Sequence, residues 1–304
     1  MSQRPHTPVL LRQVLATLNP QPGQTIVDCT LGLGGHSNAI LERIKPAGHL
    51  ISIDFDPDNI AAARERLTKT HGPSGRHVRF DLIHNNFAAI QTILANTKAD
   101  AILADIGVAS TQIDDPSRGF SYRRPGPLDM RMDPTRGQPA SALLARLSEA
   151  ELTAALLELA DETDAPAIAR LIVHQRTIEP ITTTERLTAI VCAARDFTPE
   201  RAAGAKLHPA ARTFQALRIL VNRELANLDR LLAVLPSCLA PGGVAAIITF
   251  HSGEDRKVKA AFRDGLRAGT YSDMGDDPIT ADDSELHRNP RSRSAKLRWA
   301  RVSQ

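Results

Sequence analysis

Three glycines crowd the four positions 32–35, directly after a strand-like apolar run that begins at Ile26. Glycine lets a backbone approach a ligand where a Cβ would collide, and a helix opening at His36 or Ser37 would present unpaired N–H groups to it. This combination is typical of a cofactor-binding turn. A plain structural turn is the alternative, because so short a motif also occurs without a ligand.

Asp54 lies twenty positions beyond Gly34, where the apolar run 50–53 ends. A carboxylate at this place can accept hydrogen bonds from both hydroxyls of a ribose, so the ligand is expected to contain a nucleoside. A dinucleotide fingerprint needs a last glycine, but Ser37 stands at that position. S-adenosylmethionine has no pyrophosphate and needs no such glycine, and Asp28 offers negative charge near its sulfonium. The spacing therefore favours S-adenosylmethionine.

The elements that must hold these residues alternate between strand-like and helix-like segments from residue 25 to about 107. Alternation of this kind predicts a parallel sheet with right-handed crossovers, and ligands of such sheets lie beyond the carboxyl ends of the strands. Strands are also expected over 78–83 and 101–105. The polar residues that fall at strand ends are Asp28, Asp54, Asn86 and Asp105.

Residues 113–212 interrupt this pattern with a Pro-, Gly-, Arg- and Asp-rich stretch, followed by short amphipathic helices without a strand signal. We therefore expect an inserted helical domain over 113–212. The nucleoside-binding domain is then made of residues 1–112 and 213–304.

Local signals mark several helices in the second half of the chain. A capping box opens one helix at Ser148, Asp164 is expected to start another, and Thr184 is expected to cap a third. Apolar residues at spacings of three and four then predict one long helix from about Arg212 to Val234. These signals predict an all-helical insert that leads back into the sheet.

The sheet pattern returns after that helix. A strand is expected over 244–250, ending at His251, and a helix is expected to follow it. The basic stretch 288–301 closes the chain, and the alternation over 295–302 is typical of an edge strand.

Composition narrows the classes of protein. The 304 residues carry a net charge of only +3, with a sequence pI near 8.9, which permits an anionic partner without requiring one. The three cysteines form no pair or metal motif, which suits a reducing compartment and argues against disulfides or structural zinc. No apolar run approaches the roughly 20 residues that span a bilayer, so a soluble, cytoplasmic protein without a membrane partner is expected.

Longer motifs occur in one order along nearly the whole chain. They are His6–Leu11, Asp28–Ser37, Asp105–Val108, Gln112, Arg118–Ser121, Gly126–Asp133, His208–Ala210, Arg212–Ile219, Phe250–Ser252, Glu254–Arg256 and Asn289–Arg298. This set resembles the bacterial 16S ribosomal RNA (cytosine-N4)-methyltransferase family.

The resemblance implies an α/β fold, a Rossmann-like class I S-adenosylmethionine-dependent methyltransferase with a helical insert domain. It also implies methyl transfer to N4 of one cytidine in the decoding centre of 16S ribosomal RNA. That RNA is expected to be bound within the small ribosomal subunit. A homodimer is compatible with the sequence, which does not define the oligomeric state. The implied cofactor contacts are Gly34, Gly35, His36, Asp54, Phe87, Asp105 and Gln112.

The exocyclic amine of cytosine is a weak nucleophile, because its lone pair is delocalised into the ring. An acceptor that holds one amine N–H would align it, and Asp105 is the leading candidate, with His251 as a weaker one. The Pro-Pro-aromatic segment common after this strand in enzymes that methylate amines is missing. Phe120 or Tyr122 is the candidate for stacking on the flipped base. Methylation at carbon 5 is disfavoured because it needs a cysteine nucleophile, and none lies near Asp105 in the sequence.

Clustered cations are expected to form a track for RNA phosphates, although a solvated surface would look similar in the sequence. Alternative functions are a methyltransferase acting on another RNA nucleotide or on protein, a dinucleotide-dependent oxidoreductase, and an RNA-binding protein without turnover. The candidate cations are Arg118, Arg212, Arg218, Arg291, Arg293 and Arg298.

The chain departs from the family pattern in three places. Residues 161–164 replace a Gly-Glu-Glu-Arg-like run, residues 109–111 replace a Ser-Ser-Pro-like run, and Gly253 replaces an apolar residue. These departures put in doubt any role of the insert glutamates, but not the cofactor site.

Overall fold

The computed structural model describes residues 8–75 and 78–304, so the motif residues His6 and Thr7 lie outside the described residues. The chain forms two compact units, one of residues up to Gly107 together with Leu225–Gln304, the other of Val108–Glu224. The first unit contains the sheet and the second is helical. The observed boundaries thus put Gln112 and Arg218 in the helical unit, whereas the expected ones put them in the nucleoside-binding domain.

One seven-stranded sheet, in the order β3-β2-β1-β4-β5-β7-β6, forms the centre of the first unit as far as the described residues show. Neighbours among β1 to β5 run parallel, and β7 runs antiparallel to both β5 and β6. The parallel part agrees with the sheet that the alternating pattern predicts, and the whole arrangement agrees with the α/β fold that the family resemblance implies. The strands are β1 Thr25–Asp28, β2 His49–Asp54, β3 Arg79–His84, β4 Ala99–Asp105, β5 Leu239–Thr249, β6 Tyr271–Met274 and β7 Lys296–Val302.

The expected edge strand at the C-terminus is not at an edge. β7 lies between β5 and β6, and Tyr271–Met274 forms the outer strand instead. The polar-apolar alternation of β7 led to the wrong expectation, because Arg298 is a charged residue with a buried side chain. From the sequence alone, a buried arginine that pairs with an acidic residue cannot be distinguished from one that faces solvent.

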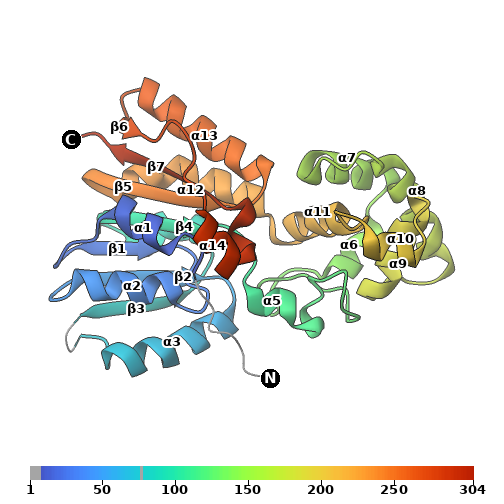
Figure 1. Ribbon diagram of the computed structural model, residues 1–304, viewed down its shortest axis with the longest axis horizontal. Coiled ribbons are helices and arrows are strands. Elements are labelled where there is room, and N and C mark those ends of the chain that lie inside the picture. Colours follow the sequence, from blue (N-terminus) through green and yellow to red (C-terminus); the bar gives the residue numbers. More distant parts are fainter. Residues whose placement is uncertain (1–7, 76–77) are drawn as a thin grey trace. The chain divides into compact units, whose positions relative to one another are not determined.

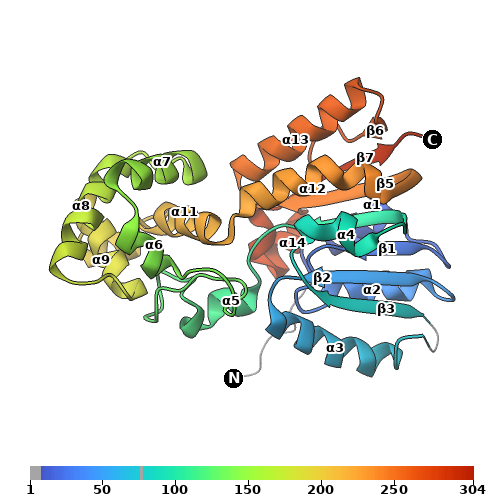
Figure 2. The same cartoon turned by 180° about the vertical axis from the view of Figure 1, so that it is seen from behind.

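Helices cover both faces of the sheet and form one apolar core on each side. Successive residues of a strand point to opposite faces, so neighbours along a strand belong to different cores. Ile26 packs with α1, α2 and α3, and its neighbour Val27 packs with α4, α12 and α13. Figures 1 and 2 show α1 and α2 on one face and α4 and α12 on the other. Bounds in this unit are α1 Leu11–Leu18, α2 Gly35–Ile44, α3 Pro57–His71, α4 Ile90–Leu94, α12 Glu224–Cys238, α13 Ser252–Arg267 and α14 Asp283–Arg288, with 3-10 turns at Phe87–Ala89 and Pro290–Ser294.

The second unit packs its helices around one apolar core that includes Leu144, Leu156, Ile172 and Phe214. Figure 1 shows this unit in green to yellow. Its helices are α5 Ser110–Asp114, α6 Ala140–Arg146, α7 Glu149–Ala160, α8 Ala165–Ile178, α9 Thr184–Ala194, α10 Pro199–Gly204 and α11 Ala211–Asn222, with a 3-10 turn at Pro116–Arg118.

The capping box at Ser148 is confirmed, since Ser148 Oγ accepts the Glu151 N–H at 3.2 Å and Glu151 Oε2 accepts the Ser148 N–H at 2.8 Å. The expected cap at Thr184 is wrong by one residue. Thr183 Oγ1 accepts from the first turn of α9, while the buried Thr184 hydroxyl donates to the carbonyl of Arg124 at 2.8 Å. Two adjacent threonines divide these tasks, and the sequence cannot distinguish them.

The long helix expected over 212–234 is two helices, α11 and α12. Arg223 adopts a left-handed conformation with φ 53°, and its N–H caps the carbonyls of Ile219 and Leu220. Neither glycine nor proline marks this break, so the apolar spacing runs through it unchanged.

No helix in residues 8–75 and 78–304 has the length and apolar character needed to cross a bilayer. Within the same residues, no group of three or more His, Cys, Asp and Glu side chains is arranged to hold a metal ion.

Candidate functional site

The glycine turn joins β1 to α2. Gly34, with φ 73°, is the N-cap of α2, which therefore begins at Gly35, one residue before the earliest expected start. A Cβ on Gly34 would lie 3.3 Å from Ala63 Cβ, and one on Gly35 would collide with Pro8. These two glycines are thus required by the protein's own packing. A Cβ on Gly32 would enter open space, which leaves this part of the turn accessible to a ligand.

Asp28 holds the glycine turn through hydrogen bonds to residues on either side of it. It is fully buried, its Oδ2 accepts the Ser37 hydroxyl at 2.7 Å, and its Oδ1 accepts the Thr30 N–H at 3.1 Å. Burial raises the pKa of Asp28 above its usual value, against the hydrogen bonds from Ser37 and Thr30. Ser37, the residue in place of a third glycine, also contacts Ser52 Oγ at 2.9 Å. Its hydroxyl therefore links the first turn of α2 to β1 and β2.

Asp54 ties β2 to the turn. Its Oδ2 accepts the Gly32 N–H at 2.7 Å, and its Oδ1 accepts from Asp56 N at 2.8 Å and Asn59 Nδ2 at 3.3 Å. Burial raises the pKa of Asp54 to about 6, although these hydrogen bonds oppose the rise. A carboxylate offers about four acceptor positions, so Oδ2 retains capacity for one further donor such as a hydroxyl.

Asp105 ends β4 beside the turn. Thr30 Oγ1 accepts the Asp105 N–H at 2.6 Å, which fixes the backbone, and His36 Nδ1 lies 3.8 Å from Asp105 Oδ2. The side chain is 23% exposed, yet Oδ1 is buried and has no hydrogen-bond partner among the described residues. Burial raises the pKa of Asp105 to about 6; the His36 charge opposes the rise, and Asp28 and Glu254 add to it. A buried, unpartnered acceptor at the mouth of the sheet is a position for a donor from outside the chain.

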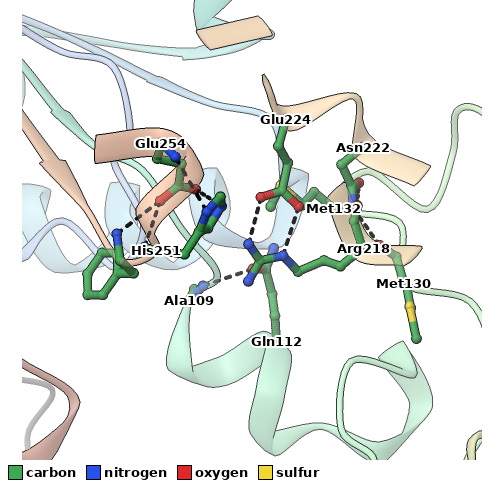
Figure 3. Close-up of polar contacts among 10 residues, drawn as sticks. Ala109, Gln112, Met130, Met132, Arg218, Asn222, Glu224, His251 and Glu254 are labelled. Atoms are coloured by element: carbon green, nitrogen blue, oxygen red, sulfur yellow. Dashed lines mark hydrogen bonds and ion pairs between the residues drawn. The ribbon is translucent and has the colours of Figure 1, made fainter. Parts of the chain in front are cut away.

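His251 begins α13 after β5. Its Nδ1 accepts the Glu254 N–H at 3.4 Å, and its Nε2 lies 2.9 Å from Glu254 Oε1, an ion-pair distance without the alignment of a hydrogen bond. Figure 3 shows the two side chains pointing toward each other. Glu254 Oε2 also accepts the Phe250 N–H at 2.9 Å. His251 therefore has a structural role at the helix start, which leaves Asp105 as the better placed acceptor.

The other two expected cofactor contacts, Phe87 and Gln112, belong to different units. Phe87 is half-buried in the turn after β3 and packs in part against the core beneath it. Gln112 belongs to the helical unit, where its Oε1 accepts the Ala109 N–H at 2.9 Å (Figure 3). The turn, Asp54, Phe87 and Asp105 therefore belong to the sheet-containing unit, and Gln112 stays a prediction for the helical unit.

The two candidates for base stacking differ in the structure. Phe120 is only 9% exposed and belongs to the core of the helical unit, so it presents no open ring face. Tyr122 is half-buried and stacks on His208, with ring centroids 4.6 Å apart and an interplanar angle of 21°. The exposed Arg123 places its guanidinium 5.7 Å from the Tyr122 ring centre. Phe120 is thus corrected to a core residue, and Tyr122 remains a candidate.

The candidate cations of the helical unit already hold it together. Arg118 donates to the carbonyls of Arg131 and Met132, and Arg212 donates to the carbonyl of Asp161. Arg218 forms two bonds of 2.8 Å to Glu224, as Figure 3 shows. The sequence showed these arginines only as clustered charges and gave no sign of their partners within the protein.

The C-terminal cations separate into two kinds. Arg291 and Arg293 are exposed in the 3-10 turn before β7. Arg298 is 4% exposed and donates from Nε to Asp255 Oδ1 at 2.6 Å. The expectation that Arg298 contacts RNA is therefore wrong, because its charge is buried and paired within the protein.

Sequence reasoning missed three residues that orient the site. Thr30 holds the backbone of Asp105, the carbonyl of Val9 lies 2.9 Å from His36 Nε2, and Glu254 braces the end of β5. Glu254 follows His251 by three positions, the spacing of a capping box, which could have revealed it. Val9 contributes only a backbone atom, for which no side-chain signal exists.

A model of the MraW methylase family matches residues 3–303. The chain belongs to this family. Curated relatives named ribosomal RNA small subunit methyltransferase H include one from Acidobacterium capsulatum, 41% identical, with 99% of each chain covered. Another from Sorangium cellulosum is 45% identical, over 97% of this chain and 90% of the relative. A solved rRNA methylase from Streptococcus thermophilus covers 100% of this chain and 99% of its own with 11% identity and a TM-score of 0.42, too low to add to the assignment.

Membership of the MraW methylase family makes the protein an S-adenosylmethionine-dependent methyltransferase and implies methylation of ribosomal RNA. The residues present fit this cofactor. The open space at Gly32 and the remaining acceptor position on Asp54 lie at one end of the sheet, and Asp54 would hold the ribose. When bound, the cofactor supplies a methyl group on a sulfonium.

Proposed function

We propose that this protein methylates N4 of a cytidine in the decoding centre of 16S ribosomal RNA. The observation that carries the proposal is Asp105 Oδ1, a buried carboxylate oxygen without a partner among the described residues. It supplies the acceptor that an exocyclic amine requires. The family relatives, whose names specify the small ribosomal subunit, support an RNA target.

The amine nitrogen of cytosine must turn its lone pair toward the methyl carbon. An N–H held by Asp105 Oδ1 fixes that orientation and gives near-attack geometry. Asp105 would then accept the proton that the amine nitrogen loses when it takes the methyl group that the bound cofactor would supply, leaving the cofactor without its methyl group. This role requires the ionised carboxylate, whose pKa of about 6 lies close enough to neutrality for proton transfer.

Methylation at carbon 5 fits the chain poorly. That reaction needs a cysteine thiolate, and the cysteine next to the site, Cys29, is 1% exposed and packs in the core on one face of the sheet. Burial, together with the charges of Asp28 and Cys238, raises the pKa of Cys29 well above its usual value. Its thiol therefore stays protonated and enclosed.

The target base must leave its stack before the amine can reach Asp105. Within the helical unit, the Tyr122–His208 stack beside Arg123 combines aromatic faces with a cation, the combination that binds unstacked bases. Burial lowers the pKa of His208, and the neighbouring Arg123 charge lowers it further, so the ring is neutral near pH 7. We assign base stacking to this pair and phosphate contacts to the exposed Arg291 and Arg293.

Nucleoside mass spectrometry of 16S ribosomal RNA, from cells with and without this gene, tests the proposal. N4-methylated cytidine at a decoding-centre position should disappear with the gene and return with the wild-type copy, but not with Asp105→Asn. An unchanged content of N4-methylcytidine, with loss of a different methylated nucleoside, would refute the assignment. Purified small subunits should also accept labelled methyl faster than naked RNA, with rates that fall as salt rises.

A further inference from the structure

The ring of His36 is held in one orientation from outside its own helix. It is 5% exposed in the first turn of α2, and its Nε2 lies 2.9 Å from the carbonyl oxygen of Val9. A carbonyl oxygen can only accept, so Nε2 carries a proton. The segment before α1 is fixed as well, because Pro8 packs on Gly35 and the Leu10 N–H donates to Glu285 Oε1 at 2.6 Å.

With Nε2 protonated, Nδ1 is left to face Asp105 Oδ2 at 3.8 Å. In a neutral ring Nδ1 is an acceptor, and two acceptors facing each other in a buried site repel. The arrangement is favourable when one added proton is present, on Nδ1 or on the carboxyl group. The facing atoms, His36 Nδ1 and Asp105 Oδ2, are therefore compatible only when a proton lies on one of them.

The other charged groups around Asp105 oppose its ionisation. Asp28 lies beneath it at the end of β1, and Glu254 approaches from α13; both carboxylates, like burial, raise the pKa of Asp105. His36, from α2, is the group that lowers it. The acceptor for the amine thus depends on His36 to be ionised near neutral pH.

We propose that His36 is a positioning residue that acts through Asp105: its ring, fixed by Val9, keeps the Asp105 carboxylate ionised and turns Oδ1 toward the amine N–H. This inference rests on the proposed function only for the identity of the amine. It gives the His36 side chain a task distinct from the cofactor contact that the family resemblance implies.

The test is the titration of Asp105 in the protein without cofactor, followed through its carboxyl carbon by NMR. In His36→Gln, the amide can still donate to Val9 but cannot carry charge, so the apparent pKa of Asp105 should rise by about 1 to 3 units. His71→Gln is the matched control. His71 is also a buried histidine near a carboxylate, Glu42 at 3.3 Å, but has no contact to Asp105. It should leave the titration of Asp105 unchanged.

Activity gives a second readout. The acid limb of kcat should move to higher pH in His36→Gln, with a KM for S-adenosylmethionine within about threefold of wild type. An unmoved limb with a greatly raised KM would make His36 a cofactor contact and overturn the proposal. Should His36→Gln fail to fold, the ring ¹⁵N shifts of His36 are compared between wild type and Asp105→Asn across pH, and identical curves would equally refute the coupling. A different target nucleoside would overturn the proposed function while leaving the coupled titration intact.

Discussion

Arg298 and Asp255 form a buried ion pair between β7 and α13. Arg298 Nε donates to Asp255 Oδ1 at 2.6 Å, and Lys296 Nζ reaches Asp255 Oδ2 at 3.1 Å. Burial alone would raise the pKa of Asp255, but the hydrogen bonds and charges of Arg298 and Lys296 lower it below its usual value. The basic C-terminal stretch therefore contains both a structural cation and exposed ones.

Replacing Arg298 by alanine should destabilise the protein by about 3 to 5 kcal/mol, because the Asp255 charge loses its buried partner and retains the more exposed Lys296. Replacing Arg291 and Arg293 together should leave the free energy of unfolding within about 0.5 kcal/mol of wild type, since both side chains are exposed. The double variant should instead raise KM for the RNA substrate and reduce its salt dependence. Denaturant unfolding and steady-state kinetics measure these effects. If Arg298→Ala were as stable as wild type but bound RNA more weakly, Arg298 would not be the structural cation described here.

Asp105→Asn should abolish methyl transfer and stabilise the protein without ligand above pH 6. The folded pKa of about 6 exceeds the usual 3.8, so the stability linked to this proton is complete below about pH 4 and is lost as pH rises through 6. Asparagine removes the buried charge, so thermal unfolding should show a gain at pH 7.5 and little at pH 4. Asp273→Asn, at an exposed position on β6, serves as the control and should show no such pH-dependent gain.

Asp54→Ala should weaken S-adenosylmethionine binding by about 1 to 3 kcal/mol, the range for losing a hydrogen bond to a charged group. Wild-type affinity should also fall as pH drops below about 6, because protonation of Asp54 weakens its acceptance of hydroxyl groups. Isothermal calorimetry measures both. Asp58→Ala is the matched control, an exposed acid four residues on, and should bind as wild type. Equal affinity of the two variants would remove Asp54 from the site.

Tyr122→Ala should raise KM for RNA by the equivalent of about 1 to 3 kcal/mol, the usual value of one base–aromatic stack. Tyr122→Phe retains the ring and should restore most of the affinity, whereas the affinity for S-adenosylmethionine should not change in either variant. Phe120→Leu should lower stability rather than RNA affinity, because Phe120 is a core residue. Equal RNA kinetics for Tyr122→Ala and wild type would exclude the stack from substrate binding.

Local patterns in the sequence were sufficient for the elements that short-range chemistry controls. Alternating strand and helix signals predicted the parallel sheet, and the positions of Asp28, Asp54 and Asp105 at strand ends follow from strand length alone. The capping box at Ser148 was also correct, because its two hydrogen bonds join residues three apart.

Only the tertiary structure decided the tasks that depend on distant partners. Asp255, 43 residues before Arg298, makes that arginine a buried structural cation, and core packing removes Phe120 as a stacking candidate. The break between α11 and α12 arises from the left-handed backbone conformation of Arg223, which an arginine in the sequence does not predict. The pairing of His36 with Asp105 depends on the Val9 carbonyl, a backbone atom that every residue type possesses. A sequence shows which groups are present, but folding decides which of them are left to face a ligand.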